Sequence, residues 1–392
     1  MFAPRRRLPV RIVRTAGDLL ASLLSLVGRL VTRALRFSES WLLGRKKARY
    51  GLAVTRIIVG LVAFVQLAAN WSTRSYTWGP GMAWTSQLGS PASDLPHVWF
   101  FSFFDSINES RASFTAGYLL LAALALVIVA GWRTKIVLPI FLCLWVGFID
   151  LNSLVHDQGD NIYRMLLIYL VFADTSSRFS VDALLRSRTP ATLRNATRAG
   201  ARYEPFSNIL HNLAIVVVTM HVSFIYMSGA LYKAEGQTWQ NGYAIFNPLH
   251  VMRFSNWPEL ADFITSLGPL VVALSWGTIV IQMMFLPMLL NRVTRILALM
   301  GIFGFHLGIA FFMGLPFFSF AMVAIDSIFI RDATWRKLRT AIRRAWLKHA
   351  DPPLVDSRPV LDASGLPLPV PKSRVTEKVP EANEPAADLV RL

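Results

Sequence analysis

Long apolar segments alternate with short polar connections along most of this chain. Each segment predicts a membrane-crossing helix, because about 20 apolar residues rising about 1.5 Å each span the hydrocarbon core of a bilayer. The pattern predicts about eight spans, at about 51–71, 114–132, 136–151, 161–173, 211–232, 264–290, 296–313 and 316–330. The segments 161–173 and 316–330 are short for a full crossing, and one of them could be re-entrant. The expected fold class is an all-α polytopic transmembrane helix bundle.

Composition and charge agree with a membrane protein. The chain is 54% hydrophobic and only 16% charged, which excludes an ordinary soluble domain. Its net charge of +17 comes mostly from Lys and Arg beside the apolar segments, so the positive-inside rule explains it without a nucleic-acid partner. The Arg-rich loop 174–209 is then cytosolic, and the aromatic loop 72–112, forming an interfacial belt or short lid helices, lies outside. We expect a multi-pass protein of a bacterial-type cytoplasmic membrane with both termini in the cytosol.

The two ends of the chain differ from the bundle. Residues 1–49 alternate leucines with arginines at helical spacing, which predicts a basic amphipathic helix on the membrane surface. Residues 331–349 predict a second such helix, and 350–392 a disordered proline-rich tail, leaving 50–330 as the transmembrane domain. The expected partners are lipids of the anionic leaflet. A protein partner for the first helix is the alternative.

A polar stripe on the span 211–232 is the first candidate site. Asn212, Thr219, Tyr226 and Lys233 recur every seven residues, so they stay on one helix face with a drift of about 20° per heptad. Such a stripe should face protein rather than lipid. An ionisable group inside a membrane indicates a functional site, although Lys233 at a helix end could also snorkel to the headgroups.

Other polar groups interrupt the apolar segments. Arg56 either snorkels or holds an anionic or carbonyl group. The run HDQGDNIYR, residues 156–164, forms either an ordinary outer loop or a polar cavity. His306 lies about 140° to 200° around its helix from Gly301, Gly304 and Gly308, so we expect the glycine face to pack closely and His306 to face a cavity, a neighbour or lipid. The histidine spacing and the single cysteine, Cys143, predict no metal site.

Several of these residues also follow a known family pattern. The motif Tyr226-x-x-Gly-Ala-x-x-Lys233, followed by Trp239-x-x-Gly242, resembles the signature of the horizontally transferred transmembrane (HTTM) family, relatives of the vitamin K-dependent gamma-carboxylase. Further matches over about 50–330 are Arg56, Gly131 before a basic turn, Gly159-Asp160 with Arg164, and the sequence FHLGIAFFMGLPFFSFAM around His306.

The resemblance implies a carboxylase- or epoxidase-like enzyme that uses a reduced quinone of the vitamin K hydroquinone or menaquinol type. Lys233 would be the base, with Asp160 and His306 as proton-transfer partners. The implied cofactor-binding residues are Arg56, Tyr226, Trp239 and Arg164. Burial in an apolar site favours a neutral amine, which suits a base.

This chain also departs from the carboxylase. It has Gly159-Asp160 where the animal enzyme has an Asn-His pair, and we expect no large outer domain for a propeptide after the last span. Protein gamma-carboxylation is therefore not expected. Two other classes of function stay open: a non-catalytic membrane scaffold that recruits partners, and a transporter of lipid-like molecules.

Overall fold

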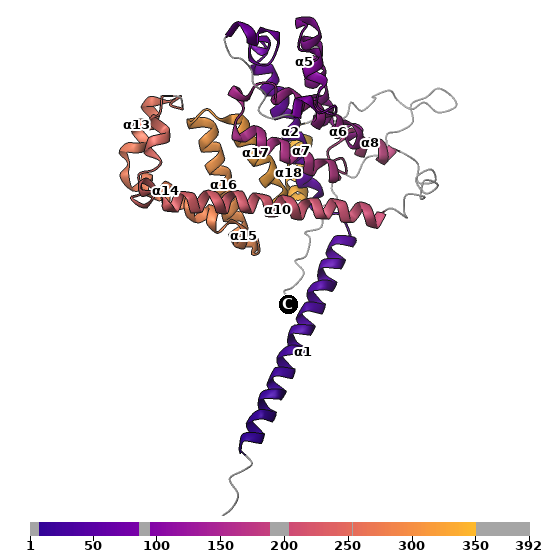
Figure 1. Cartoon of the computed structure of the whole chain (residues 1–392), viewed down its shortest axis with the longest axis vertical. Helices are drawn as coiled ribbons and strands as arrows, with labels where there is room; N and C mark the ends of the chain where they lie inside the picture. The colour runs from indigo at the N-terminus through magenta and orange to yellow at the C-terminus, as the bar shows by residue number, and fades with distance from the viewer. Residues whose placement is uncertain (1–7, 86–94, 189–203, 253, 350–392) are drawn as a thin grey trace, which may run out of the picture. The chain divides into compact units, whose positions relative to one another are not determined.

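The computed structural model describes residues 8–85, 95–188, 204–252 and 254–349, and within these ranges every regular element is a helix (Figure 1). The first elements are α1 (Leu8–Leu43), α2 (Arg49–Ala69), α3 (Arg74–Thr77), η2 (Pro80–Thr85), η3 (Leu95–His97), α4 (Phe103–Ile107), α5 (Arg111–Ala130), α6 (Thr134–Ile149), η4 (Ser153–Val155), α7 (Gln158–Phe172) and α8 (Val181–Arg188). The others are α10 (Glu204–Glu235), α11 (Gln237–Gln240), α12 (Phe246–His250), α13 (Pro258–Ser266), α14 (Gly268–Met283), α15 (Phe285–Met288), α16 (Arg292–Phe312), α17 (Pro316–Asp326), η6 (Ser327–Phe329) and α18 (Asp332–His349).

Four described helices are long and apolar enough to cross a membrane: α2, α5, α10 and α16. The pair α13 and α14 makes a fifth if the two helices count as one span. Helix α6 and the segment Pro316–Phe329 are apolar but shorter. The all-α membrane fold is therefore confirmed, whereas the count of eight spans stays a prediction.

The predicted span 264–290 is not one continuous helix, and whether it crosses the membrane stays a prediction. Helices α13 and α14 meet at an angle of 94° at Leu267, and α15 begins separately at Phe285. Pro269 lies in the first turn of α14, where its missing N–H costs nothing, but a proline there cannot continue a preceding helix. The break therefore follows from the Gly268-Pro269 pair.

Helix α2 packs against α5 on one side and α17 on the other. Two glycines permit these contacts: a Cβ on Gly60 would lie 2.8 Å from the Ala125 carbonyl oxygen of α5, and one on Gly51 would lie 2.8 Å from the Ser327 carbonyl oxygen. The Thr55 hydroxyl also donates to the Ala324 carbonyl at 2.8 Å. Close backbone approach and polar contacts are what hold helices together where lipid removes the hydrophobic drive.

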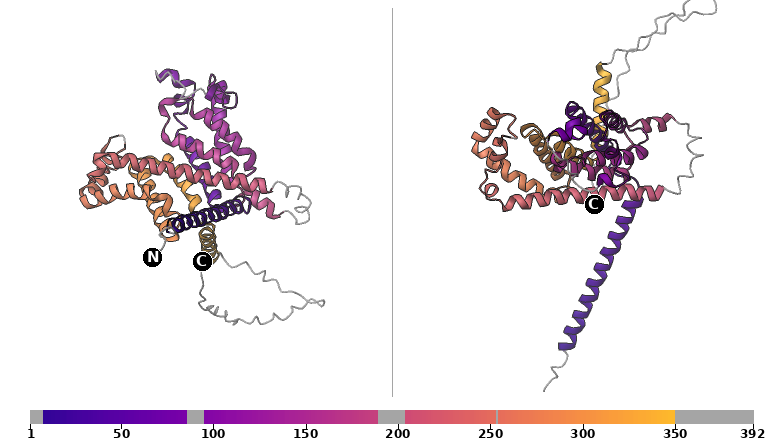
Figure 2. Two further views of the ribbon diagram at one scale, coloured as in Figure 1. Left: turned by 60° about the horizontal axis from the view of Figure 1, so that its bottom comes forward. Right: turned by 45° about the horizontal axis from the view of Figure 1, so that its top comes forward.

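Aromatic side chains fill the space between α2, α5, α6 and α7, a group of helices that Figure 2 shows from two further directions. Phe104 of α4 is fully buried against Phe114 and Phe148, so α4, in the described part of the aromatic loop, packs onto the bundle. Buried hydroxyls pair with backbone: Tyr118 donates to the Leu67 carbonyl at 2.6 Å and Tyr163 to the Val59 carbonyl at 2.7 Å. The core thus leaves neither of these hydroxyls unsatisfied.

Helix α10, 32 residues long, packs against α1, α7 and α14 (Figure 1). Its first turns satisfy the carbonyls that end α1: Asn208 donates to Leu43 and Gly44, and Asn212 donates to Trp41, Leu42 and Arg45. The last carbonyls of a helix have no partner within it, so these amides act as a C-terminal cap supplied by another helix.

The start of α2 is capped in a similar way from far along the chain. Ala48, the residue before the helix, has a φ of 46° and offers no side-chain cap. The Asp332 carboxylate instead accepts the Tyr50 N–H at 3.0 Å and the Arg49 N–H at 3.3 Å. A carboxylate at a helix N-terminus also balances the positive end of the helix dipole.

The expected packing of α16 through its glycine face is wrong. Gly304 and Gly308 have no atom within 4 Å of an added Cβ, and Gly301 meets only the Ile281 side chain. The buried face of α16 carries Ala298, Leu299, Ile302 and His306. This face packs against α17 and α14, and His306, only 1% exposed, points into the protein.

The contacts divide the chain into two units, residues 1–338 and 339–392, with the division inside α18. In α1, the residues from Asp18 to Ser40 are all exposed. The predicted surface role of α1 and α18 stays a prediction, and the predicted tail 350–392 lies outside the described residues.

Candidate functional site

The Lys233 side chain turns toward protein groups on three other elements. Its Nζ donates to the Gln282 Oε1 of α14 at 2.7 Å and lies 5.5 Å from the ring centroids of both Trp239 of α11 and Phe305 of α16. Lys233 is part-buried and Gln282 is buried. No salt bridge to Lys233 exists among the residues that the structure describes. The amine is thus held by a neutral amide and aromatic rings rather than by a carboxylate.

Two turns earlier on α10, Tyr226 joins a fully buried polar cluster. Its hydroxyl donates to Asp326 Oδ2 of α17 at 2.7 Å and lies 3.2 Å from His306 Nε2 of α16. The three side chains are at most 1% exposed. Within the described residues, Asp326 Oδ1 and His306 Nδ1 have no hydrogen-bond partner. They are two of 13 buried side-chain atoms without a partner in this part of the chain, and each such atom calls for an explanation such as a catalytic role or a bound water.

Aromatic rings pack against the Tyr226–Asp326–His306 cluster. Phe285 packs edge-on against Tyr226 with centroids 4.8 Å apart, and Phe318 packs against His306 at 5.7 Å. Phe305, which contacts Lys233, directly precedes His306. Lys233 and the Tyr226–Asp326–His306 cluster therefore share one region bounded by α10, α14, α16 and α17, in a low-dielectric surrounding where polar contacts are strong.

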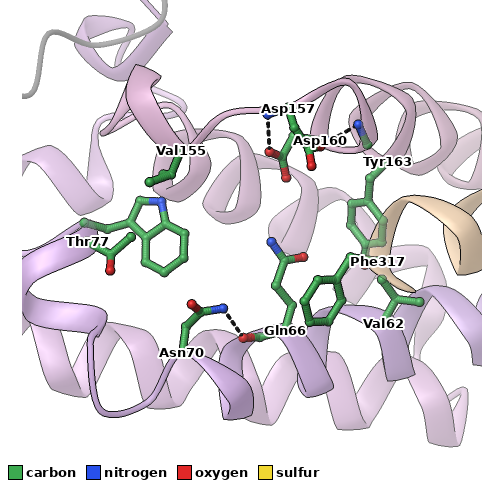
Figure 3. Close-up of a pocket in the computed structure, with 11 residues that line it drawn as sticks. Val62, Gln66, Asn70, Thr77, Val155, Asp157, Asp160, Tyr163 and Phe317 are labelled. Atoms are coloured by element: carbon green, nitrogen blue, oxygen red, sulfur yellow. Dashed lines mark hydrogen bonds between the residues drawn. The ribbon is translucent and has the colours of Figure 1, made fainter. Parts of the chain in front are cut away.

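Asp160 lies elsewhere, at a second candidate place. It belongs to a capping box at the start of α7, where Asp157 Oδ1 accepts the N–H groups of Gly159 and Asp160, and Asp160 Oδ2 accepts the N–H of Asp157. Figure 3 shows Asp157 and Asp160 above Gln66 of α2 and Asn70, which follows that helix, at a cavity of about 200 Å³. Of the two interpretations of this run, the polar cavity is the one observed.

Helix α17 separates the two places. Phe317 lines the Asp160 cavity, while its neighbour Phe318 contacts His306. A Cβ on Gly159 would lie 3.2 Å from both Cα and Cβ of Phe318, so a side chain there would press against α17. The family-like Gly159 therefore has a packing reason, and Asp160 is not brought to Lys233 by any described contact.

Arg164 also lies apart from Lys233. Its guanidinium is 3.7 Å from Asp150 Oδ2 and donates to Asn161 Oδ1 at 3.0 Å, and His156 Nε2 is 3.6 Å from Asp150 Oδ1. Asp150 is buried at the end of α6. These contacts join the connection between α6 and α7, so Arg164 and His156 both have a structural use there.

Arg56 is fully buried and binds only backbone carbonyls. It donates to Ile128 at 2.5 Å and Val129 at 2.7 Å, in the last turn of α5, and to Thr175 and Phe179 in the loop before α8. A cation is well suited to the unpaired carbonyls at a helix C-terminus. Of the two interpretations of Arg56, a residue that holds carbonyl groups is the one observed, and those groups belong to the protein itself.

The candidate residues thus divide into three places. Lys233, Tyr226, Trp239 and His306 lie in one region, Asp160 lines a separate cavity, and Arg56 and Arg164 hold loops. Two further polar residues of the Lys233 region, Gln282 and Asp326, were not predicted. A signal for both exists, because each is a polar side chain inside an apolar segment, the same criterion that selected Lys233.

No group of His, Cys, Asp and Glu side chains in the described ranges could hold a metal ion. The polar groups of the site are the Lys233 amine, the Gln282 amide and the buried Tyr226, His306 and Asp326 side chains, and the aromatic rings beside Lys233 are those of Trp239 and Phe305. Such a set can bind an apolar ring and move protons, and the fold and site together define a polytopic α-helical membrane protein with a polar centre between its helices.

Comparison with known proteins agrees with this class. Residues 45–335, about three quarters of the chain, match the HTTM domain, so the chain belongs to the HTTM family. No curated protein and no solved structure matches it.

Proposed function

We propose that this HTTM protein is a carboxylase- or epoxidase-like membrane enzyme in which Lys233 acts as the base toward a reduced quinone. The supporting observation is the surrounding of Lys233: a neutral amide at 2.7 Å, two aromatic rings at 5.5 Å, and no carboxylate bridge within the described residues. A carboxylate would stabilise the ammonium form, whereas this surrounding leaves the neutral amine accessible.

The side chains of this region have the chemistry that a quinone-type ring would need. Trp239 and Phe305 offer apolar faces beside Nζ, and the unpartnered His306 Nδ1 and Asp326 Oδ1 are acceptors close by. A reduced quinone would supply a phenolic hydroxyl as the acid. Lys233 Nζ would take up that proton, Gln282 Oε1 would orient the amine through its hydrogen bond, and the aromatic rings would exclude water.

The test is turnover of a menaquinol-type quinol by purified protein in nanodiscs with oxygen and carbon dioxide. Quinol loss and epoxide formation are followed by mass spectrometry for the wild type, Lys233→Met and Lys337→Met. Removing a general base should lower the rate about 10²- to 10⁴-fold. Lys337 is an exposed cation of α18, so its variant should match the wild type. Equal turnover of Lys233→Met and wild type, or no turnover by any protein, would overturn the proposal.

We also propose the finer topology: about eight spans in a bacterial-type cytoplasmic membrane, with both termini cytosolic. The family membership and the position of the basic segments beside the apolar helices support it. Cysteine accessibility can test the topology, after Cys143 is replaced by serine and single cysteines are placed at each end. We expect a membrane-impermeant thiol reagent to label the cysteines at the two ends only when it is given access to the cytosolic side of the membrane.

A further proposal concerns the surface of α1. Its exposed leucines cover about half of the helix circumference, and the mean direction of Arg29, Arg33 and Arg36 lies about 130° around the helix from the mean direction of these leucines. This arrangement suits a helix lying in an anionic leaflet with its apolar face in the acyl region. The lipids of that leaflet are therefore the partner that we assign to it.

A further inference from the structure

The hydrogen bonds of the buried cluster have a defined direction. The Tyr226 hydroxyl donates its only proton to Asp326 Oδ2, 2.7 Å away. The Tyr226 oxygen is then left with lone pairs toward His306 Nε2, 3.2 Å away. For that contact to be a hydrogen bond, Nε2 must carry a proton and donate it.

This direction fixes the tautomer of His306. A neutral imidazole carries one proton, so if Nε2 holds it, Nδ1 is a bare acceptor. His306 Nδ1 is the nitrogen that has no partner among the described residues, although the side chain is only 1% exposed. The cluster therefore presents a free lone pair within a water-poor part of the protein.

We propose that Asp326 is a positioning residue which, through the Tyr226 hydroxyl, holds His306 in the Nε2–H form and leaves Nδ1 as a second proton acceptor beside Lys233. The inference rests on the proposed function of Lys233 and adds Asp326 and the direction of proton movement to it. Among the described residues, the Asp326 carboxyl group hydrogen-bonds only to Tyr226, so it acts through the tyrosine and the histidine.

In the proposed step the proton moves from Lys233 to His306. Lys233 Nζ, once protonated, gives one proton to His306 Nδ1, directly or through water, and returns to the neutral amine. His306 becomes an imidazolium with protons on both nitrogens. Tyr226 keeps its own proton in its hydrogen bond to Asp326. An acidic side chain that fixes the orientation and tautomer of a histidine is a known arrangement in hydrolases, there without an intervening tyrosine.

A purely structural cluster would not need this polarity. Phenylalanine, leucine and similar side chains surround the three residues and would pack the same volume without burying a carboxylate in a membrane protein. Orienting a histidine explains why an acid is present, and the free Nδ1 explains what the orientation is for.

The experiment reads the tautomer directly by NMR of ¹⁵N-histidine-labelled protein in nanodiscs, with the His306 signals assigned by His306→Gln. The wild type is expected to show Nε2 protonated and Nδ1 bare. In Asp326→Asn the amide can donate to the Tyr226 oxygen, so the tyrosine proton turns to Nε2 and the proton of His306 moves to Nδ1. In Tyr226→Phe the link is absent and both tautomers are expected.

The matched control is Asp262→Asn, which removes an exposed carboxylate that pairs with His250 and should leave His306 unchanged. A wild-type His306 protonated on Nδ1 would overturn the inference even if no variant folds, and so would an unchanged tautomer in folded Asp326→Asn. Quinol turnover of Asp326→Asn is expected to fall at least tenfold. Because the NMR readout needs no turnover, a fixed tautomer in an inactive wild type would contradict the proposed enzyme activity alone.

Discussion

Arg56 illustrates how a buried cation can serve the backbone rather than a ligand. All its hydrogen bonds go to carbonyls of Ile128, Val129, Thr175 and Phe179. Arg56→Met removes the donors and leaves buried carbonyls unpaired, so we expect the free energy of unfolding to fall by about 3–5 kcal/mol.

Thermal unfolding in detergent, followed by tryptophan fluorescence, measures this effect. Arg343→Met, on the exposed surface of α18, is the control and should unfold like the wild type. An Arg56→Met protein with an unchanged midpoint but lost turnover would instead assign Arg56 to the ligand site.

Gln282 provides a sharper test of the lysine than removing it. Gln282→Glu keeps the shape of the side chain but places a carboxylate 2.7 Å from Lys233 Nζ, which stabilises the ammonium form. We expect quinol turnover at neutral pH to fall at least tenfold and its pH optimum to move upward. Gln282→Leu, which adds no charge, should lose less activity and keep the optimum. Identical pH profiles for the two variants would contradict the role of Lys233 as a base.

At the same scale, sequence spacing predicted which residues share a face of α10 but not what lies opposite. The heptad interval placed Asn212 and Tyr226 on the buried side, and both are at most 1% exposed. Asp326 and Gln282 come from segments 49 to 100 residues away along the chain, so their contacts depend on helix packing that no local pattern encodes. Arg56 could not be resolved from sequence, because a cation binds a carbonyl of a ligand or of the backbone equally well.

Among the elements, the connection between α1 and α2 is held by a polar cluster at the end of α7 and the start of α10. Lys46 Nζ donates to Asp174 Oδ2 at 2.9 Å. His211 Nδ1 accepts the Asp174 N–H at 2.9 Å, so its Nε2 donates to the Lys47 carbonyl at 2.8 Å. These hydrogen bonds fix the connection between α1 and α2 against α7 and α10.

The pH dependence of this cluster can be predicted. Burial alone would raise the pKa of Asp174, but the hydrogen bond and the charge of Lys46 outweigh it and hold that pKa below its usual value. The ionised carboxylate therefore stabilises the fold above the unfolded-state pKa, about 3.9, and this stability is lost as the pH falls through the lower folded value.

Unfolding midpoints of wild type and Asp174→Asn measure it. At pH 7 and pH 5 the wild type should be more stable by about 1 kcal/mol, and the difference should shrink as the pH falls below the unfolded-state pKa of about 3.9. If the stability difference between the wild type and Asp174→Asn persisted or grew in acid, the Lys46–Asp174 ion pair could not be its cause.

Element boundaries were predicted well where apolar length alone decides them. The spans at 51–71 and 114–132 correspond to Arg49–Ala69 and Arg111–Ala130, each within two or three residues. The break within the predicted span 264–290 was missed, because hydropathy does not register the Gly268-Pro269 pair that imposes it. The close packing predicted through the glycine face of α16 was incorrect for another reason. Small residues permit a close approach, but whether a neighbouring helix lies against them depends on the tertiary packing.

On the scale of the whole molecule, the family match, the apolar helices and the buried polar centre are consistent with one another. Residues 45–335 belong to the HTTM domain, and the helices that carry Lys233, Gln282, His306 and Asp326 all lie within it. The residues before and after this domain include α1 and α18, whose contribution is a separate question from the chemistry.

Deleting residues 1–45 should therefore separate membrane attachment from catalysis. We expect weaker binding of anionic vesicles and unchanged quinol turnover per folded molecule, because no residue of the Lys233 region comes from this segment. The measurements are vesicle flotation with and without anionic lipid and the turnover assay. If the deletion abolished quinol turnover while Lys233→Met kept the turnover of the wild type, a membrane scaffold would be the favoured class of function.

The central claim is that a ligand binds beside Lys233 rather than in the Asp160 cavity. A cryo-EM map of the protein in nanodiscs with a menaquinol-type quinol tests it most directly. The account predicts ring density next to Lys233 Nζ, between Trp239 and Phe305, with Gln282 still in contact. A ring in the cavity lined by Gln66 and Asp160, or a Lys233 side chain turned to the headgroups with nothing beside it, would contradict the account.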